Sequence, residues 1–169
     1  MANVALIGYR GTGKSTVARL LAKRLRLEML CLDDEVVKKA GRSIPDIVRI
    51  GGWELFRALE SEVVREAVGR QGRVLDTGGG VVTRLENVQA LRDWGTVIWL
   101  TATPEELAGR ISESNDRPSL TGAKSFVREI GEVLAEREPL YRAAAHFEVS
   151  TSGRTAEEVA SEAAKLVRK

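Results

Sequence analysis

The sequence predicts an α/β fold in which a parallel β-sheet carries helices on both faces. Short apolar runs alternate along the chain with segments of helical period, and this alternation favours a parallel sheet. The apolar runs are uninterrupted, as expected of strands that are covered on both faces. In addition, the octapeptide GYRGTGKS at residues 8–15 fits the P-loop pattern G-x-x-x-x-G-K-[ST], in which a phosphate-binding turn joins a strand to a helix.

Five strands are predicted, at residues 3–7, 29–32, 74–77, 96–101 and 146–149. The first predicted helix, at residues 16–25, follows the P-loop directly. Capping signatures, in which Ser or Thr precedes an acidic residue by three positions, indicate three more helix starts. They are SIPD at residues 43–46, TPEE at 103–106 and TAEE at 155–158, and we expect the first of them to begin a short helix.

Two stretches interrupt the alternation. Residues 33–61, between the second and third strands, are expected to be mostly helical. Residues 112–124 are polar, contain Pro118 and Gly122, and have no periodicity, which is typical of a flexible loop. Such a loop over a phosphate site can close as a lid that excludes water, and a plain surface connection is the alternative.

Size, composition and charge limit the class of protein. With 169 residues, 43% hydrophobic and 30% charged, the chain resembles one soluble globular domain, which we place at residues 1–169. No apolar stretch reaches the length of a membrane span and the first strand begins at once, so we expect no membrane partner and no secretory signal.

The net charge of +2 gives no support to a nucleic-acid partner. The single cysteine, Cys31, rules out an internal disulfide and favours the cytoplasm, and the single histidine, His146, argues against a metal cluster or a Ser-His-Asp triad.

The P-loop predicts a nucleotide site. A glycine-rich turn before a helix aims backbone amides at one point, where the helix dipole favours an anion. Lys14 is expected to contact the β- and γ-phosphates of ATP, and the Ser15 hydroxyl to bind Mg²⁺. The residues expected to bind the nucleotide in this loop are Gly11, Thr12, Gly13, Lys14, Ser15 and Thr16.

Candidates for a second substrate lie farther along the chain. Asp33 follows the second strand, where ligands gather in parallel sheets, although it could equally cap the next helix. Arg57 has Glu60 one turn later, so an ion pair within the helix is the alternative to a ligand clamp. The three glycines at residues 78–80 allow close approach to a bound molecule, and Arg137 stands just before the helix-disturbing Pro139. Arginine binds carboxylates in a bidentate manner and aspartate accepts from hydroxyls, which suits a small hydroxylated acid.

In this order and over nearly the whole chain, these residues resemble the shikimate kinase family of the nucleoside-monophosphate-kinase-like P-loop proteins. The resemblance implies a three-layer α/β/α fold with a five-stranded parallel sheet, a helical substrate-binding insertion at about 33–61 and a lid at about 112–124. It also implies a monomer that phosphorylates the 3-hydroxyl of shikimate with ATP, on the route to chorismate and aromatic amino acids. The matching pieces are residues 8–15, Asp33, the stretches 41–44, 52–57 and 78–80, Arg117 with Pro118, and Arg137 with the sequence PLY at 139–141.

The resemblance also implies roles for single residues. Asp33 would hold the shikimate hydroxyls and act as the candidate base, while Arg57 and Arg137 would clamp the carboxylate. Gly79 and Gly80 would offer backbone contacts to shikimate.

Three further arginines are implied on the nucleotide side. Arg117 would reach the phosphates from the lid, and Arg110 would lie against the adenine, together with the segment that ends at Arg154.

The chain departs from the family pattern at the cation site. The family has two aspartates, D-x-D, after the second strand; Asp33 matches the second, and Cys31 falls on the first. A thiol is a poor ligand for a hard cation. We hypothesise that Asp76 makes the water-mediated Mg²⁺ contact instead, because other P-loop enzymes carry an aspartate at this strand end. The alternative is that Asp76 caps the glycine turn.

Two other functions stay open at this point. One is a P-loop kinase of another small acceptor, such as gluconate or a nucleoside monophosphate, since two arginines favour a carboxylate without naming its owner. The other is a nucleotide-binding protein without turnover, which the thiol at Cys31 keeps open.

Overall fold

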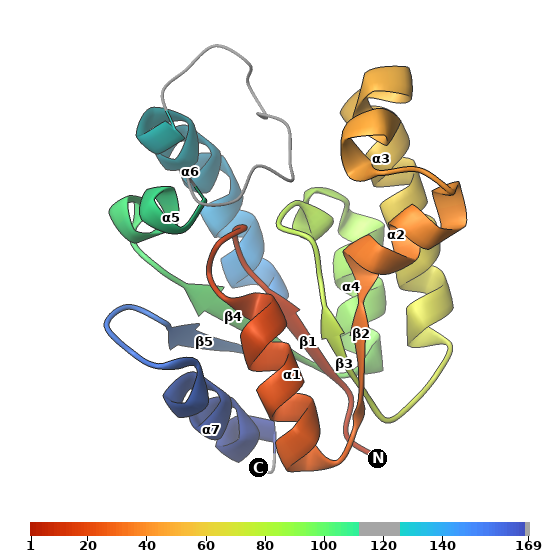
Figure 1. The fold of residues 1–169 in the computed structure, drawn as a ribbon. Helices are drawn as coiled ribbons and strands as arrows, with labels where there is room; N and C mark the ends of the chain where they lie inside the picture. Colours follow the sequence, from red (N-terminus) through yellow and green to blue (C-terminus); the bar gives the residue numbers. More distant parts are fainter. Residues whose placement is uncertain (112–125, 168–169) are drawn as a thin grey trace.

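The computed structural model describes residues 1–111 and 126–167, which contain a five-stranded parallel sheet with helices on both faces (Figure 1). The strand order is β2-β3-β1-β4-β5, and every neighbouring pair is parallel. Each of the five predicted strands is confirmed, with its ends within one residue of the prediction. They are β1 (Val4–Ile7), β2 (Glu28–Cys31), β3 (Arg73–Asp76), β4 (Thr96–Thr101) and β5 (Phe147–Ser150).

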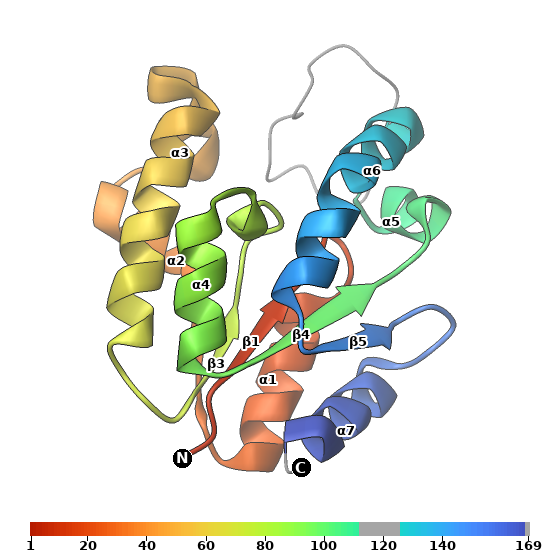
Figure 2. The ribbon, with the colours of Figure 1, turned by 180° about the vertical axis from the view of Figure 1, so that it is seen from behind.

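The helices form the two outer layers. α1 and α7 cover one face of the sheet, and α3, α4 and α6 cover the other, as the two opposite views show (Figures 1 and 2). The described helices are α1 (Lys14–Leu25), α2 (Leu32–Ala40), α3 (Ile44–Val68), α4 (Leu85–Trp94), α5 (Pro104–Ile111), α6 (Phe126–Ala144) and α7 (Ala156–Val167), with a 3₁₀ turn η1 (Val81–Thr83).

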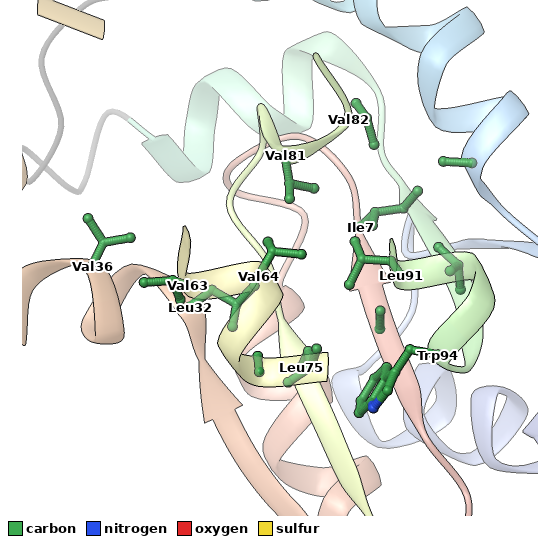
Figure 3. Close-up of a cluster of buried hydrophobic side chains, with 14 of the residues drawn as sticks. Ile7, Leu32, Val36, Val63, Val64, Leu75, Val81, Val82, Leu91 and Trp94 are labelled. Atoms are coloured by element: carbon green, nitrogen blue, oxygen red, sulfur yellow. The ribbon is translucent and has the colours of Figure 1, made fainter. Parts of the chain in front are cut away.

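Side chains of β1 divide between two cores. Val4 and Leu6 pack with α1 and α7, whereas Ile7 packs with the cluster under α3 and α4, and all three are 0% exposed. Figure 3 shows that second cluster, where Ile7 and Leu75 of the sheet lie among helical side chains. Full burial of a Leu or Ile side chain contributes about 1.5–3 kcal/mol, so both faces of the strand are stabilised and the sequence reads as one continuous apolar run.

The three capping signatures are confirmed. Thr103 Oγ1 accepts a hydrogen bond from the Glu106 amide at 3.2 Å, and the Thr155 hydroxyl accepts from the Glu158 amide at the same distance. Ser43 Oγ likewise accepts from the Asp46 amide at 3.3 Å. These bonds satisfy amide groups that would otherwise lack partners at the helix N-termini.

The helix that begins after Ser43 is short, as expected, because it is broken at Gly52, whose φ of 68° and ψ of −176° are not helical. A second helix continues from there to Val68, and α3 contains both. Glycine adopts a positive φ without steric cost. Gly52 therefore allows the sharp change of backbone conformation between the two helical parts of α3. Pro139 is similarly tolerated: it lies within α6, which continues to Ala144.

The expected lid is not tested. Arg117, Pro118 and the rest of the predicted lid lie outside the described residues, so the lid stays a prediction. Within the described part of the chain, every helix is too short or too polar to cross a membrane.

Candidate active site

The P-loop backbone is shaped by three glycines. Gly8, Gly11 and Gly13 have φ values of 143°, 87° and 89°, which L side chains rarely adopt. A Cβ on Gly8 would lie 2.4 Å from the Leu100 carbonyl oxygen of the neighbouring strand, so this position also excludes a side chain by contact. Gly13 is the N-cap of α1, and the loop therefore presents its amides at a helix N-terminus.

Two cations lie against this loop. The buried Lys14 Nζ donates to the carbonyl oxygens of Gly8 at 2.6 Å and Tyr9 at 3.0 Å. From α5, Arg110 Nη1 donates to the Gly11 carbonyl oxygen at 3.0 Å. Both cations are thus held at the phosphate turn by its own backbone.

A carboxylate lies beside the end of the loop. Ser15 Oγ donates to Asp76 Oδ2 at 2.5 Å, and Asp76 is the last residue of β3. Asp76 pairs in register with Cys31 at the end of β2, so the two side chains stand at one level of the sheet. Burial raises the pKa of the Cys31 thiol to about 11, and the charge of Asp76 adds to this rise, which keeps the thiol neutral.

No group of three His, Cys, Asp or Glu side chains that could hold a metal ion exists among the residues that the structure describes. A cation near Ser15 and Asp76 would therefore take its other ligands from phosphate and water. This ligand set fits Mg²⁺, which keeps several waters and binds few protein groups.

A cavity of about 490 Å³ joins the P-loop to the glycine turn after β3. It lies at the carboxyl ends of the strands, where ligands of open parallel sheets bind. Its lining residues are Arg10, Gly11, Gly13, Lys14, Ser15, Thr16, Cys31, Asp33, Asp34, Ile44, Asp76, Thr77, Gly79, Arg110 and Ile111.

The glycine turn is crowded by charged side chains. A Cβ on Gly80 would lie 2.0 Å from Arg57 Nη2, and one on Gly78 would lie 2.6 Å from Glu60 Oε1. Asp33 Oδ1 also lies 3.0 Å from the Cβ position of Gly78. A side chain at Gly78 or Gly80 would therefore have to displace these charged groups.

Arg57 and Glu60 form a buried ion pair within α3, as their i,i+3 spacing indicates, and a ligand contact of Arg57 stays a prediction beside this pair. Arg57 Nη1 lies 2.7 Å from Glu60 Oε2, and the two side chains are 12% and 1% exposed. The guanidinium also packs over the rings of Trp53 and Phe56. Burial raises the pKa of Glu60, while the charges of Arg57 and Arg137 oppose the rise.

Arg137 reaches the same turn from α6. Its Nη1 lies 3.6 Å from the Cβ position of Gly79, and the buried Tyr141 hydroxyl donates to the Gly79 carbonyl oxygen. Burial raises the pKa of Tyr141 to about 12, while the positive charge of Arg137 opposes the rise. Because Arg57 lies against Gly80 and Arg137 against the adjacent Gly79, the structure brings these distant arginines to one turn.

Asp33 lies near the turn but not where the sequence predicted. β2 ends at Cys31, and Asp33 is the second residue of α2. Cys31 is the N-cap of this helix, so the alternative in which Asp33 caps it is wrong. An aspartate in the first turn is favoured by the helix dipole, and this placement still directs Asp33 toward Gly78.

Arg154 lies in the loop between β5 and α7 and is absent from the described lining of the cavity. It donates to the Ser150 carbonyl oxygen at 3.0 Å and pairs with Glu162 at 2.6 Å. Arg154 therefore stabilises this loop.

Sequence reasoning assigned no role to two residues of the site. Arg10, at a variable position of the P-loop pattern, lines the cavity, and its backbone nitrogen lies 3.2 Å from the Cβ position of Gly79. In the sequence, Tyr141 stands out only as part of PLY at residues 139–141. Its position four residues after Arg137 is the signal that places both side chains on one face of the helix.

Known proteins are similar to this chain in sequence and in fold. The family model described as "Shikimate kinase" matches residues 10–168. "Shikimate kinase" from Geobacter metallireducens is 44% identical over 160 residues, which cover 95% of this chain and 88% of that protein. "Shikimate kinase 2" from Enterobacter sp. is 42% identical over 168 residues, covering 98% and 95%.

A solved structure shows the same likeness. Shikimate kinase from Acinetobacter baumannii, in complex with shikimate, superposes with a TM-score of 0.95 at 34% identity, covering 99% of this chain and 93% of that one. The match along almost the whole length, in sequence and in fold, shows that the chain belongs to the shikimate kinase family.

Proposed function

We propose that this protein transfers the γ-phosphoryl group of ATP to the 3-hydroxyl of shikimate, giving shikimate 3-phosphate and ADP, in the formation of chorismate and aromatic amino acids. The observation that carries the proposal is a single cavity that joins a P-loop to a glycine turn flanked by Arg57 and Arg137. Family membership supports the identity of the acceptor.

The P-loop side would bind ATP. Lys14, held at the phosphate turn, would contact the β- and γ-phosphates, and Arg110 over the loop would lie against the adenine, with Arg154 stabilising the adjacent loop. Arg117 would bring a further positive charge to the transferring group. Backbone or hydroxyl groups of Gly11, Thr12, Gly13, Ser15 and Thr16 complete this half.

Mg²⁺ would accompany the nucleotide. Ser15 would be its direct protein ligand and Asp76 its water-mediated one, which the hydrogen bond between these two side chains supports. The cation would neutralise phosphate charge during transfer.

The turn side would bind shikimate. Arg57 and Arg137 would hold the carboxylate, and Gly79 and Gly80 would contact the ring substituents through their backbone. Asp33 would orient the 3-hydroxyl and accept its proton as the oxygen bonds to the γ-phosphorus and the bond to ADP breaks. Rate enhancement then comes mainly from positioning and charge stabilisation.

We also propose that the protein acts as a cytoplasmic monomer on small molecules, without a nucleic-acid or membrane partner. The near balance of 26 basic and 24 acidic residues supports the absence of a nucleic-acid partner.

A coupled assay of ADP release tests the function. With Mg²⁺ and ATP, we expect shikimate to start turnover, while gluconate and nucleoside monophosphates leave the background rate unchanged. Turnover with one of those acceptors and none with shikimate would reassign the acceptor. Calorimetry that detects ATP binding in a protein without turnover would instead indicate a nucleotide-binding protein.

A further inference from the structure

We propose that His146 is an acid-sensitive clasp between the end of α6 and the sheet: its neutral imidazole holds the two together, and protonation of the ring releases them. This role is independent of the proposed function. His146 lies between α6, which ends at Ala144, and β5, which begins at Phe147. Figure 2 shows this end of α6 turning into β5 beside β4.

The clasp consists of two hydrogen bonds to one residue of β4. The His146 amide donates to the Val97 carbonyl oxygen at 2.8 Å, and Nδ1 of the imidazole accepts from the Val97 amide at 2.9 Å. Val97 is 0% exposed, and a buried amide without an acceptor is costly. Because the pairing of β5 with β4 begins only at Phe147 and Ile98, the imidazole supplies the acceptor where the strand does not yet reach.

Only the neutral ring can accept this hydrogen bond. A histidine nitrogen accepts when it carries no proton, and both nitrogens of an imidazolium are donors. The bond from the Val97 amide therefore places the proton of the neutral ring on Nε2. The side chain of His146 is otherwise exposed, so a proton can reach the ring without unfolding of the chain.

A fixed cation next to the ring opposes its protonation. Arg92 of α4 donates through Nη1 to the carbonyl oxygen of Ala144 at 2.9 Å, and to those of Ala143 and Ala145 at 3.3 Å. These bonds satisfy carbonyl groups at the C-terminus of α6 and hold the guanidinium there. Partial burial lowers the pKa of His146, and the positive charge of Arg92 lowers it further.

The other charged groups around the ring are paired or exposed. Asp93 of α4 accepts from Gln89 at 2.8 Å, and Arg142 of α6 pairs with Glu138 at 3.0 Å. Glu148, two residues farther along β5, is exposed to solvent, which screens its charge. β4 contains no charged residue. Arg92 is therefore the fixed charge nearest to the clasp among the residues that the structure describes.

Stability should consequently fall in mild acid. The unfolded chain binds the histidine proton at about pH 6.5, whereas the folded chain binds it only at a lower pH. The stability that His146 contributes is therefore complete above the unfolded pKa and is lost as the pH falls through the pKa of the folded state. Since α6 also carries Arg137, the clasp fixes the end of a helix that reaches the candidate active site.

NMR of the imidazole tests the clasp in the wild-type protein, because His146 is the only histidine. We expect the Nε2–H tautomer at pH 7.5 and a pKa below 6.5. The Nδ1–H tautomer, or a pKa of 6.5 or more, would overturn the inference. Arg92→Gln removes the neighbouring charge and should raise this pKa; an unchanged value would overturn the part assigned to Arg92.

Two variants separate the acceptor from the titration. His146→Asn keeps an acceptor oxygen at the δ position and does not titrate. Between pH 7.5 and pH 5.0, the melting temperature of wild type should fall by about 2–4 °C more than that of His146→Asn, as expected for loss of one hydrogen bond in a chain of this size. His146→Ala, which has no acceptor, should melt about 2–4 °C below wild type already at pH 7.5. Equal pH dependence of wild type and His146→Asn would show that His146 is not the acid-sensitive group.

Discussion

The proposed nucleotide side and the proposed acceptor side of the cavity, called the two sides below, are built in different ways. The P-loop is one contiguous segment, and its shape comes from backbone dihedrals at Gly8, Gly11 and Gly13. The acceptor side combines side chains of α2, α3 and α6 around the turn after β3, and these lie far apart in the sequence. The proposed phosphate site is therefore a local property of the chain, whereas the proposed acceptor site depends on the tertiary fold.

The two sides also compensate their charges differently. Lys14 is held by backbone carbonyl oxygens, which are neutral. Arg57 is held by Glu60, a buried carboxylate that pairs through one oxygen. Removing one charge of this pair would leave the other buried without compensation. Substitutions on the acceptor side should therefore affect both binding and stability.

The largest effect is expected on the nucleotide side. Lys14→Ala should lower kcat by about 10³ or more, because a cation on the transferring phosphoryl group contributes rate enhancement of this order. The coupled assay measures the loss, and calorimetry with shikimate serves as the control. Retained shikimate binding would show that the acceptor side binds its ligand without Lys14. Loss of shikimate binding would show that the two sides depend on each other.

On the acceptor side, Arg57→Ala should weaken shikimate binding about 300-fold, because losing one partner of a buried charged contact costs about 3–4 kcal/mol. Nucleotide affinity should stay near wild type. Arg49→Ala is the matched control, since Arg49 and Asp46 form an exposed i,i+3 pair on the same helix, 3.3 Å apart. Normal shikimate affinity in Arg57→Ala would show that the acceptor pocket lies elsewhere.

The same variant should show a pH-dependent stability. Burial raises the pKa of Glu60 above 4.5, and Arg57→Ala removes the main charge that opposes this rise. A raised pKa in the folded state means that stability is lost as the pH increases and the buried carboxyl ionises. The melting temperature of Arg57→Ala should therefore fall further below that of wild type at pH 8 than at pH 5.

Between the two sides, Cys31 should react slowly with alkylating reagents. Its pKa is raised from 9.0 to about 11, so the thiolate fraction at pH 8 is about a hundredfold smaller than for an ordinary thiol. Because the chain has one cysteine, the iodoacetamide reaction, followed by mass spectrometry, reports this site alone. The rate should rise about tenfold per pH unit, and fast labelling at pH 8 would contradict the assigned environment.

The smallest effect is expected at Asp76. Asp76→Ala should reduce the Mg²⁺-dependent gain in ADP affinity about tenfold and leave shikimate affinity intact, because a water-mediated contact is one among several. Calorimetry with and without MgCl₂ measures the gain. Adding Cys31→Asp to this variant should restore it, since the two positions are paired in register. An unchanged Mg²⁺ effect in Asp76→Ala would show that Asp76 makes no contact to the cation.

The sequence predicted the sheet and the nucleotide side better than the acceptor side, for physical reasons. Strands buried on both faces read as apolar runs, and the capping bonds at Thr103 and Thr155 involve residues three positions apart. The break at Gly52 and the continuation of α6 through Pro139 were not predicted, since surrounding packing decides whether a helix tolerates such residues.

The buried contacts on the acceptor side needed the structure. The contact of Tyr141 with Gly79 joins residues that no local pattern connects. The pairing of Arg57 with Glu60 was visible as an i,i+3 spacing, but its burial against Gly78 and Gly80 was not.

The in-register pairing of Cys31 and Asp76 has a consequence for how such enzymes change over time. Adjacent parallel strands end side by side, so a functional oxygen can migrate sideways to the next strand without changing its height beneath the triphosphate. The sequence position of a carboxylate can then change during evolution while its place in the fold is kept. A sequence pattern that requires aspartate at position 31 would miss this chain, whereas a pattern that accepts a carboxylate at the end of either strand would find it.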